Sequence, residues 1–349
     1  MRDALSLSMW SGVGREELRR LLRRHTPPEA LEILGREVPQ GAPDPGDVDG
    51  ALASSDSAGM HAVVYGTGGY PEILEDIPDP PVVLFCRGNL EGFLSMPAVA
   101  VIGSRRCTRY GRSVARTLAG DFVRSGVAVV SGLARGIDGE AHMGALDASG
   151  VTMAVLGSGL DVVYPPEHAE LARRIAEKGV LVSEYPPGTE PARYRFPERN
   201  RLISGFSMGV VVVEAGRRSG TMITVNTALD QGRDVFAVPG EVTRAFSIGT
   251  NMLLRDGAGV VITAADVLEP LGIAGKDTPG PADRAELSGT GRAIVDSLAA
   301  QTLHFDQLLR KVGVGRAVLQ SELLELEMAG IVVQHPGKYY SIRRIVPRN

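Results

Sequence analysis

The sequence predicts an α/β protein built on a doubly wound parallel sheet, and three observations support this fold class. Short apolar runs such as Ala98–Ile102 alternate with longer amphipathic stretches such as 109–125. The runs are apolar throughout, which is typical of parallel strands whose two faces are both covered. Runs end in glycine or serine, as at Gly103-Ser104 and Ser131-Gly132, and a helical stretch follows. Parallel strands need such crossover helices, and these crossovers are nearly always right-handed.

The same alternation continues to about residue 271 and supplies the rest of the sheet domain, 61–271. Strands are expected at 127–130, 151–156, 180–183, 208–213, 234–238 and 260–262, with helices at 167–178 and 221–231. The prolines within 77–81 exclude a helix or a central strand there. We expect the apolar run Val82–Cys86 to add an edge strand. The stretch 196–205, which starts with Phe196-Pro197, is expected to be an anchored loop.

The N-terminal part, residues 1–60, is predicted to be a helical domain. Residues 1–40 look helical, whereas 37–60 are rich in proline, glycine, aspartate and serine and are expected to form a loop or linker. Helix 15–24 carries five arginines and follows a Gly-Val-Gly turn at 12–14. This is the outline of a helix-hairpin-helix element that binds phosphate through backbone amides. A small bundle with a solvated basic face is the alternative.

The C-terminal part divides into a linker at 272–288 and a small domain at 289–349. Three helices at 292–299, 305–312 and 316–328 precede a hairpin of 331–333 and 339–342, and this order predicts a winged helix. The third helix would read DNA in this fold, yet it carries three glutamates against Arg316 alone. It is therefore a poor recognition helix, and a structural or protein-contact role is at least as well supported.

Composition limits the classes of partner. The 349 residues carry a formal net charge of −4, so affinity for nucleic acid has to come from local patches. Cys86 and Cys107 lack the spacing of a metal or redox site and are expected to be free thiols. The sequence contains neither the apolar core of a signal peptide nor a run of membrane length, so we expect a cytoplasmic protein without membrane association.

A local excess of arginine points to a phosphate-binding edge. Seven arginines lie between residues 105 and 135 against one acid, Asp121. The glycine and serine turns that end the strands let an anion approach the backbone, and the following helix starts attract negative charge. In doubly wound sheets, ligands bind beyond the carboxyl ends of the strands, where the strand order reverses. Arg199-Asn200-Arg201 is expected at this edge, where two arginines around an amide favour phosphate or base contacts.

Other site chemistries fit the sequence less well. A dinucleotide fingerprint would need glycines at Arg105 and Thr108, so NAD or FAD is not expected. A phosphoribohydrolase would carry Gly-Thr-x-x-Glu, but Gly220-Thr221 is followed by Thr224 in the glutamate position, with Glu214 nearby.

A metal site drawn from Asp138, Glu140 and His142 is weakly supported, because no partner cluster accompanies this single turn. We expect Asp138 to be a helix N-cap instead and His142 to face the sheet or solvent. No catalytic triad or P-loop is found, and we expect neither a metal nor catalytic residues.

Several motifs occur together over nearly the whole chain: 101–105 (VIGSR), 131–138 (SGLARGID) with Ala141-His142, Tyr164-Pro165, 196–205 (FPERNRLISG), Ser219-Gly220-Thr221 and Pro239-Gly240, preceded by Tyr70-Pro71 and 77–81 (IPDPP). In this combination the chain resembles the DprA (Smf) family of bacterial DNA-processing proteins. Two small departures are Leu202, where isoleucine is usual, and Thr250, where serine or cysteine is usual.

The resemblance implies an extended Rossmann-like domain, an N-terminal domain similar to a sterile alpha motif and a C-terminal winged helix. It implies a single-stranded DNA-binding homodimer that is not an enzyme, needs no cofactor, protects single strands and loads the RecA recombinase onto them during natural transformation and recombination. The DNA-binding residues would be Gly103, Ser104, Arg105, Arg106, Arg135, Gly136, Arg199, Asn200, Arg201, Ser219, Gly220 and Thr221.

Aromatic side chains that could stack on bases are scarce, at 5% of the residues. Phe196 and Tyr110 are the stacking candidates, and we expect mostly backbone contacts with weak sequence preference. Two other functions stay open at this point: a nucleotide-binding enzyme of the phosphoribohydrolase type, and a winged-helix transcription regulator.

Overall fold

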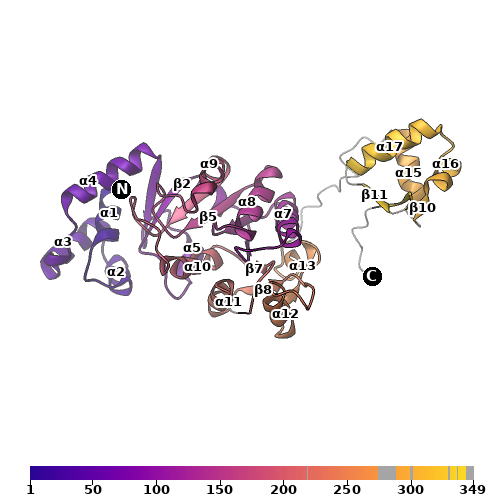
Figure 1. Ribbon diagram of the computed structural model, residues 1–349. Coiled ribbons are helices and arrows are strands. Elements are labelled where there is room, and N and C mark those ends of the chain that lie inside the picture. The colour runs from indigo at the N-terminus through magenta and orange to yellow at the C-terminus, as the bar shows by residue number, and fades with distance from the viewer. Residues whose placement is uncertain (218, 274–287, 299–301, 329–330, 336, 343–349) are drawn as a thin grey trace. The chain divides into compact units, whose positions relative to one another are not determined.

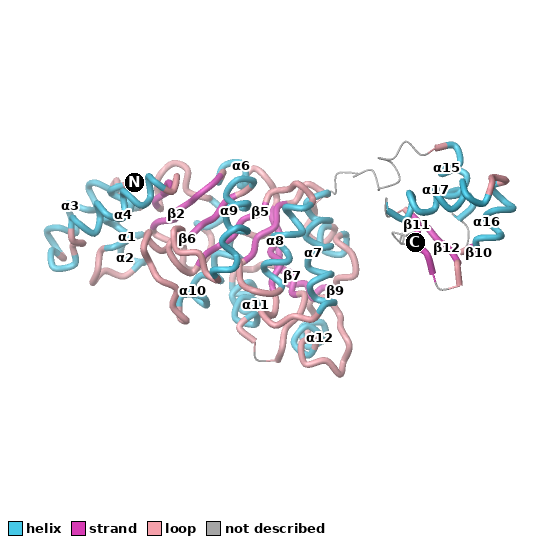
Figure 2. The backbone as a smooth tube through the Cα atoms, turned by 45° about the horizontal axis from the view of Figure 1, so that its top comes forward, coloured by secondary structure: helices cyan, strands magenta, loops and turns pink. Residues whose placement is uncertain are grey.

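The computed structural model describes residues 1–217, 219–273, 288–298, 302–328, 331–335 and 337–342. The chain forms two compact units, Met1–Lys276 and Asp277–Asn349, and each is treated by itself. The first unit holds a nine-stranded, mostly parallel sheet with helices on both faces, which confirms the predicted α/β class (Figures 1 and 2). Of the predicted linker 272–288, residues 274–287 lie outside the described residues.

The sheet reverses its strand order beside the strand β3. Its order is β1-β2-β6-β5-β4-β3-β7-β8-β9. The strands are β1 (Met60–Val64), β2 (Val83–Gly88), β3 (Ala98–Ile102), β4 (Ala128–Ser131), β5 (Thr152–Leu156), β6 (Val180–Ser183), β7 (Gly209–Val212), β8 (Asp234–Ala237) and β9 (Gly259–Val260). The chain runs outward from β3 to β6 and then returns to the other side of β3 at β7. A switch point therefore lies between β3 and β7, where doubly wound sheets bind their ligands.

Helices cover the two faces of the sheet because successive strand residues point to opposite sides. Val99 and Val101 of β3 pack in one cluster with Phe122 of α7 (Arg109–Arg124). Ala100 packs in the other cluster with Leu202 of α10 (Arg195–Gly205). The helices of this domain are α7 (Arg109–Arg124), α8 (Ile137–Asp147), α9 (Ala169–Lys178), α10 (Arg195–Gly205), α11 (Thr221–Asp230), α12 (Ile248–Arg255) and α13 (Ala265–Leu268), with a 3-10 turn η2 (Pro166–His168) before α9.

Two antiparallel strands extend the parallel part. β2 pairs with both β1 and β6, so the predicted edge position of the strand near 82–86 is wrong. The edge is β1, which was not predicted as a strand. The short helices α5 (Glu72–Glu75) and α6 (Leu90–Leu94) lie on either side of β2 in the chain. The other predicted strands are confirmed within about two residues at each end.

Two segments predicted as loops are helices. Residues 45–57 form α4 (Pro45–Ser57), which begins where the Asp44 carboxylate accepts a hydrogen bond from Gly46 N at 2.7 Å. Asp44 and Pro45 thus cap and start a helix rather than mark a loop. Residues 195–205 form α10, since Pro197 lies in its first turn, where a missing N–H breaks no helical hydrogen bond.

The N-terminal helices pack into the same hydrophobic core as β1 and β2. They are α1 (Arg2–Met9), α2 (Arg15–Leu22), α3 (Pro27–Glu37), the 3-10 turn η1 (Pro39–Gly41) and α4. Leu5, Leu34 and Val48 are buried in a cluster that also contains Val64 and Phe85 of the two strands. The helical domain is therefore joined to the sheet by apolar packing as well as by the chain.

The second unit has the predicted three helices and hairpin. It contains α15 (Gly289–Leu298), β10 (Leu303–His304), α16 (Phe305–Val312), α17 (Arg316–Met328), β11 (Val332–His335) and β12 (Tyr339–Ile342). The short strand β10, which was not predicted, pairs with β12 in a sheet of order β10-β12-β11. Ile294, Leu308 and Leu323 bring the three helices together around one core. Among all the described residues, no helix is both long and apolar enough to cross a membrane.

Candidate functional site

A cleft with a volume of about 740 Å³ opens at the switch point between β3 and β7. Its walls are the turn after β3, the first turns of α10 and the start of α11. It brings together nine of the predicted site residues: Gly103, Ser104, Arg105, Arg106, Arg199, Asn200, Ser219, Gly220 and Thr221. These residues come from three separate segments of the sequence, and the reversal of strand order is what collects them at one place.

The turn after β3 is held by backbone contacts. Ser104 N donates a hydrogen bond to Glu214 O at 2.8 Å, which ties the turn to the end of β7. The Ser104 hydroxyl accepts a bond from Arg106 N at 3.1 Å. A Cβ atom at Gly103 would lie 2.7 Å from Ile137 Cγ1, so only glycine lets the turn pack this closely on α8. The position of Arg105 is therefore set by its neighbours' backbone.

Gly136 locks this turn from the other side. Its φ of 81° and ψ of −126° lie in a region that residues with a side chain rarely adopt. A Cβ atom there would lie 2.4 Å from Ser104 O. Directly after it, Ile137 N donates to Ser104 O at 3.3 Å. Gly136 thus contributes to the cleft through its backbone alone.

Arg105 takes part in a stack of side chains at the mouth of the cleft. Its guanidinium carbon lies 5.1 Å from the centre of the Phe196 ring. The Phe196 ring in turn lies 5.7 Å from that of Tyr164. Arg135 lies beside this stack, in a small adjoining pocket lined by Tyr164 and Phe196. It is ion-paired with Glu167, and this pairing lowers the pKa of Glu167 to about 2.

Arg199 forms part of the floor of the cleft and is only 4% exposed. Its Nη1 donates to Gly132 O at 2.7 Å and to Val155 O. The buried carboxyl group of Asp138 is its charge partner. Burial raises the pKa of Asp138, and the positive charge of Arg199 opposes that rise. Burial likewise lowers the pKa of Arg199 to about 10, against the effect of Asp138.

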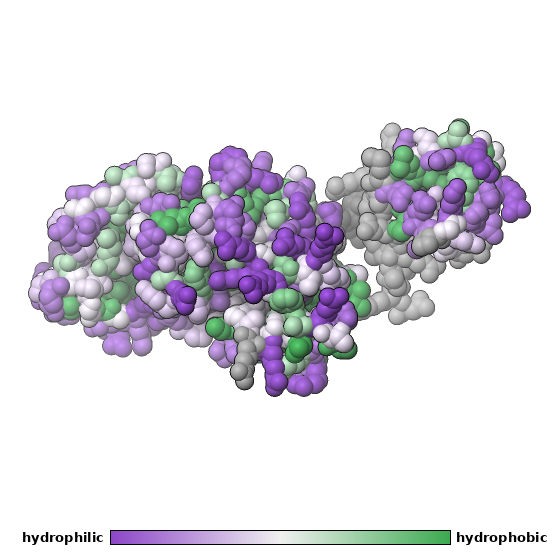
Figure 3. All heavy atoms as spheres, viewed as in Figure 1, coloured by the Kyte–Doolittle hydropathy of each residue, from purple (hydrophilic) through white to green (hydrophobic). Residues whose placement is uncertain are grey.

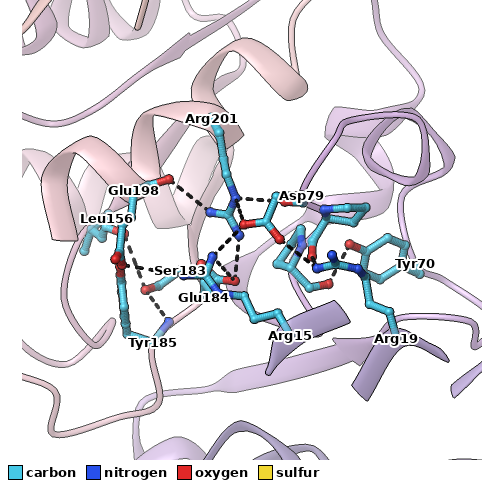
Figure 4. A network of polar contacts seen from close by, with 12 residues as sticks. Arg15, Arg19, Tyr70, Asp79, Leu156, Ser183, Glu184, Tyr185, Glu198 and Arg201 are labelled. Carbon is cyan, nitrogen blue, oxygen red and sulfur yellow. Dashed lines mark hydrogen bonds and ion pairs between the residues drawn. The ribbon is translucent and has the colours of Figure 1, made fainter. Parts of the chain in front are cut away.

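Arg201 was predicted at the same edge, and the structure places it elsewhere. Its Nη2 donates to Glu184 Oε1 at 2.7 Å, and its Nε lies 3.2 Å from Asp79 Oδ2 (Figure 4). Because Arg199 and Arg201 are two positions apart on a helix, their side chains leave it in different directions. Arg201 therefore belongs to an ion-pair network behind the cleft wall.

Three arginines that line the cleft form no ion pair. Within the described parts of the chain, no carboxylate lies within 4 Å of Arg105, Arg106 or Arg193. The arginines further along α7 are neutralised: Arg112 and Arg116 pair with Glu140, and Arg124 pairs with Asp121. A band of strongly hydrophilic residues crosses the region between α10 and α7 in Figure 3. The rim of the cleft is thus more cationic than the net charge of the chain suggests.

Arg193 lines the cleft and was not among the predicted site residues. It lies in the proline-rich loop before α10, which the sequence offered only as a connection. The one available signal was its place three residues before the Phe196-Pro197 motif.

The residues considered for a metal site serve the fold. Gly136, rather than the predicted Asp138, is the N-cap of α8, and the Asp138 carboxylate accepts from Ala134 N at 3.4 Å. His142 is fully buried, with Nδ1 2.8 Å from Thr152 Oγ1, and burial lowers its pKa to about 3. No group of three or more metal-ligating side chains is found among the described residues.

Glu214, which was considered as a catalytic acid, is engaged in holding α7. Its carboxylate accepts hydrogen bonds from Thr108 N at 2.8 Å and from Thr108 Oγ1 at 2.5 Å. It is 3% exposed. Thr224 stands in the cleft wall where a phosphoribohydrolase would carry its glutamate. Neither residue offers a free carboxylate to a bound nucleotide.

Three of the five arginines at 15–24 contact other parts of the protein. Arg15 Nη1 and Arg19 Nη1 lie 2.9 Å and 2.8 Å from the two carboxylate oxygens of Asp79. Arg23 lies over the ring of Tyr65. These three arginines dock α2 onto the sheet domain, whereas Arg20 and Arg24 are exposed. The solvated basic face therefore covers only part of the helix, and the helix-hairpin-helix interpretation stays a prediction.

Comparisons with known proteins agree with this architecture. Residues 61–272 match the family described as DNA recombination-mediator protein A, and residues 278–338 match the DprA winged helix domain. Protein Smf of Escherichia coli (strain K12) is 36% identical over 305 residues, which span 85% of this chain and 81% of that protein. DNA processing protein DprA of Streptococcus pneumoniae (strain ATCC BAA-255 / R6) is 46% identical over 200 residues. These residues span 57% of this chain and 70% of that protein.

Two solved structures are also similar. The X-ray structure of DNA processing protein A from Streptococcus pneumoniae matches with a TM-score of 0.65 at 33% identity, over 77% of this chain and 97% of that one. A structure reporting the single-stranded DNA binding mode of DNA processing protein A from Helicobacter pylori matches with a TM-score of 0.55 at 30% identity, over 61% and 95% of the two chains.

Proposed function

The chain belongs to the DNA recombination-mediator protein A family, and from this premise we propose that it binds single-stranded DNA in the cleft between β3 and β7. The observation that carries the proposal is the arrangement of Arg105 on the Phe196 ring, beside Arg106 and Arg193, which line the same cleft and form no ion pair within the described residues. Unpaired guanidinium groups attract phosphates, and an aromatic face beside them accepts a base. The single-stranded DNA binding reported for the Helicobacter pylori relative supports the same assignment.

The predicted residues divide into contacts and supports. Hydrogen-bond donors for the phosphate backbone of the DNA come from four places: the Ser104 turn, Arg105, Arg106 and the start of α11 at 219–221. Asn200 offers its amide group to a base or a phosphate. Arg135 can donate to the DNA only after its ion pair with Glu167 has broken. Arg199 and Gly136 keep the floor and the turn in place, while Arg201 acts from outside the cleft.

A preference for single-stranded DNA over duplex follows from the stacking side chains. A ring such as Phe196 can stack only on a base that is free of its pairing partner, whereas phosphate contacts alone do not separate single strands from duplex. We expect a thymidine oligonucleotide to bind more tightly than a duplex of equal length. Fluorescence anisotropy with both probes at one salt concentration tests this, and tighter binding of the duplex would contradict it.

The proposed role extends to recombination. As a homodimer in the cytoplasm, and without a cofactor, the protein would protect incoming single strands and pass them to the RecA recombinase during natural transformation. The family's description as a recombination mediator supports this. Sedimentation equilibrium checks the dimer, and RecA-driven strand exchange on strands covered by a single-strand-binding protein checks the loading. If the protein does not accelerate strand exchange, the proposed loading of RecA is wrong.

The protein would act by binding rather than by chemistry. Glu214 is committed to Thr108, and Thr224 supplies no carboxylate, so the glutamate of a phosphoribohydrolase has no counterpart here. Asp138 does line the cleft, but it is only 7% exposed and its carboxylate accepts a hydrogen bond from Ala134 N. Incubation with nucleoside monophosphates should release no ribose phosphate. Release that disappears in Glu214→Gln would support the phosphoribohydrolase instead.

Replacing Phe196 with alanine should weaken single-strand binding about tenfold, since base stacking contributes roughly 1–3 kcal/mol per base. Tyr110 is the matched control, because it lies outside this cleft, is 53% exposed and hydrogen-bonds Pro239 O at 3.3 Å. Tyr110→Ala should change the affinity much less. Anisotropy titrations of both variants separate the two stacking candidates, and a larger loss in Tyr110→Ala would place the base-binding site around Tyr110 instead.

A further inference from the structure

Helix α10 presents two different faces to two different parts of the molecule. Phe196, Asn200 and Ile203 line the cleft and are three or four positions apart, so they share one side of the helix. Glu198 and Arg201 are three apart and lie on another side, toward the network in Figure 4. Contacts that hold the face of α10 with Glu198 and Arg201 therefore also set the position of its cleft-lining face.

The face of α10 that carries Arg201 is held by an ion cluster, which we define as Arg15, Arg19, Asp79, Glu184 and Arg201. Arg201 is 8% exposed and donates to Glu184 Oε1 at 2.7 Å and to Asp79 O at 2.8 Å. Burial lowers the pKa of Arg201, but the neighbouring carboxylates of Glu184 and Asp79 more than offset this and raise it overall. The guanidinium is therefore a permanent positive charge inside the protein.

The same cluster receives the N-terminal helices. Arg19 of α2 is 8% exposed and donates both to Asp79 Oδ1 and to Pro80 O at 2.8 Å. Arg15 reaches Asp79 Oδ2 at 2.9 Å and Glu184 Oε1 at 3.5 Å. Asp79 is thus the common acceptor that joins two arginines of α2 to one arginine of α10, as Figure 4 shows.

We propose that the N-terminal helix α2 sets the position of α10 through the ion cluster, and thereby sets the affinity of the cleft for single-stranded DNA. The inference rests on the proposed function. Asp79 and Glu184 are positioning residues: neither lines the cleft, and both act on it through Arg201. Arg19 and Arg201 are buried, and a buried charge is unfavourable unless it is paired. Because the partly exposed Asp79 is an acceptor for both, the loss of its charge should loosen α10 from α2.

The variant Asp79→Asn tests the proposal because electrostatics and positioning predict opposite results. The substitution makes the protein one unit more positive, so long-range attraction alone would tighten DNA binding. The proposal predicts that binding to a thymidine oligonucleotide weakens about fivefold. The dependence of affinity on salt should stay as in the wild type, because no phosphate contact is removed.

Asp121→Asn is the matched control, since it makes the same change of charge at an exposed pair with Arg124 on α7. It should leave the affinity unchanged or slightly raised. Glu184→Gln removes the charge of the other carboxylate of the cluster and replaces Asp79→Asn as the test if that variant does not fold. It should also weaken binding to single-stranded DNA. Combining Asp79→Asn with Phe196→Ala should give less than the product of the two losses, because both act through α10.

Hydrogen exchange measured on the full chain gives a readout that does not depend on DNA. Backbone amides of α10 should exchange faster in Asp79→Asn, while those of α7 should not. Wild-type affinity in both cluster variants would overturn the inference and leave the proposed function standing. Failure of the wild type to bind single strands would overturn both.

Discussion

Gly136→Ala is expected to remove most single-strand binding although no side chain is taken from the cleft. A residue with a Cβ is strained at a φ of 81° and ψ of −126°, which costs about 1–3 kcal/mol. The new atom would lie 2.4 Å from Ser104 O and 2.8 Å from Arg105 O, so the turn that carries Arg105 has to move. Loss of one charged contact of this kind weakens binding roughly tenfold or more.

Gly35→Ala provides the control for this substitution. Gly35 lies in α3, and a Cβ atom there would meet nothing within 4 Å. Alanine in a helix should leave DNA binding unchanged and raise the stability slightly. Thermal unfolding and anisotropy titration of both variants check the prediction. If Gly136→Ala binds DNA as the wild type does, the turn after β3 does not form the site.

Arg199→Met is expected to lower the free energy of unfolding by about 3–5 kcal/mol, because it leaves the buried carboxyl group of Asp138 without its charge partner. The pKa of Asp138 is already raised by burial, so ionising it costs stability as the pH rises through that pKa. Without Arg199 the pKa rises further. The deficit of the variant should therefore be larger at a pH above neutrality than at an acidic pH, because a protonated Asp138 no longer needs a cation.

Adding Asp138→Asn to Arg199→Met should restore much of the lost stability, since the neutral amide no longer needs a cation. Urea unfolding at the two pH values measures all three proteins. A loss in Arg199→Met that is the same at both pH values would show that the destabilisation comes from lost packing and hydrogen bonds, and not from the uncompensated charge.

Much of the sheet could be predicted from the sequence because each parallel strand is a short, wholly apolar run that ends in small residues. The glycine and serine turns also indicated the edge at which the cleft lies. The helices α4 and α10 were missed for one reason. Pro45 and Pro197 were interpreted as loop markers, whereas both lie in first turns, where proline is tolerated.

The assignment of individual arginines needed the fold. With 196–205 taken as a loop, nothing in the sequence separates Arg199 from Arg201, yet the helix directs them to different sides. The pairing of Arg19 with Asp79 joins residues 60 positions apart. No local pattern reveals such a pair, and the basic helix α2 was therefore open to a phosphate-binding interpretation.

The measurement that tests the central claim most directly is a titration of single-stranded DNA over a series of salt concentrations, with the wild type and Arg105→Ala. Phosphate contacts predict that the logarithm of the wild-type affinity falls steeply with the logarithm of salt concentration. In Arg105→Ala the affinity should be lower and the slope shallower by roughly 0.7 for each lost contact. An affinity and a slope that both equal those of the wild type would contradict the account, because the strand would then not pass through the cleft between β3 and β7.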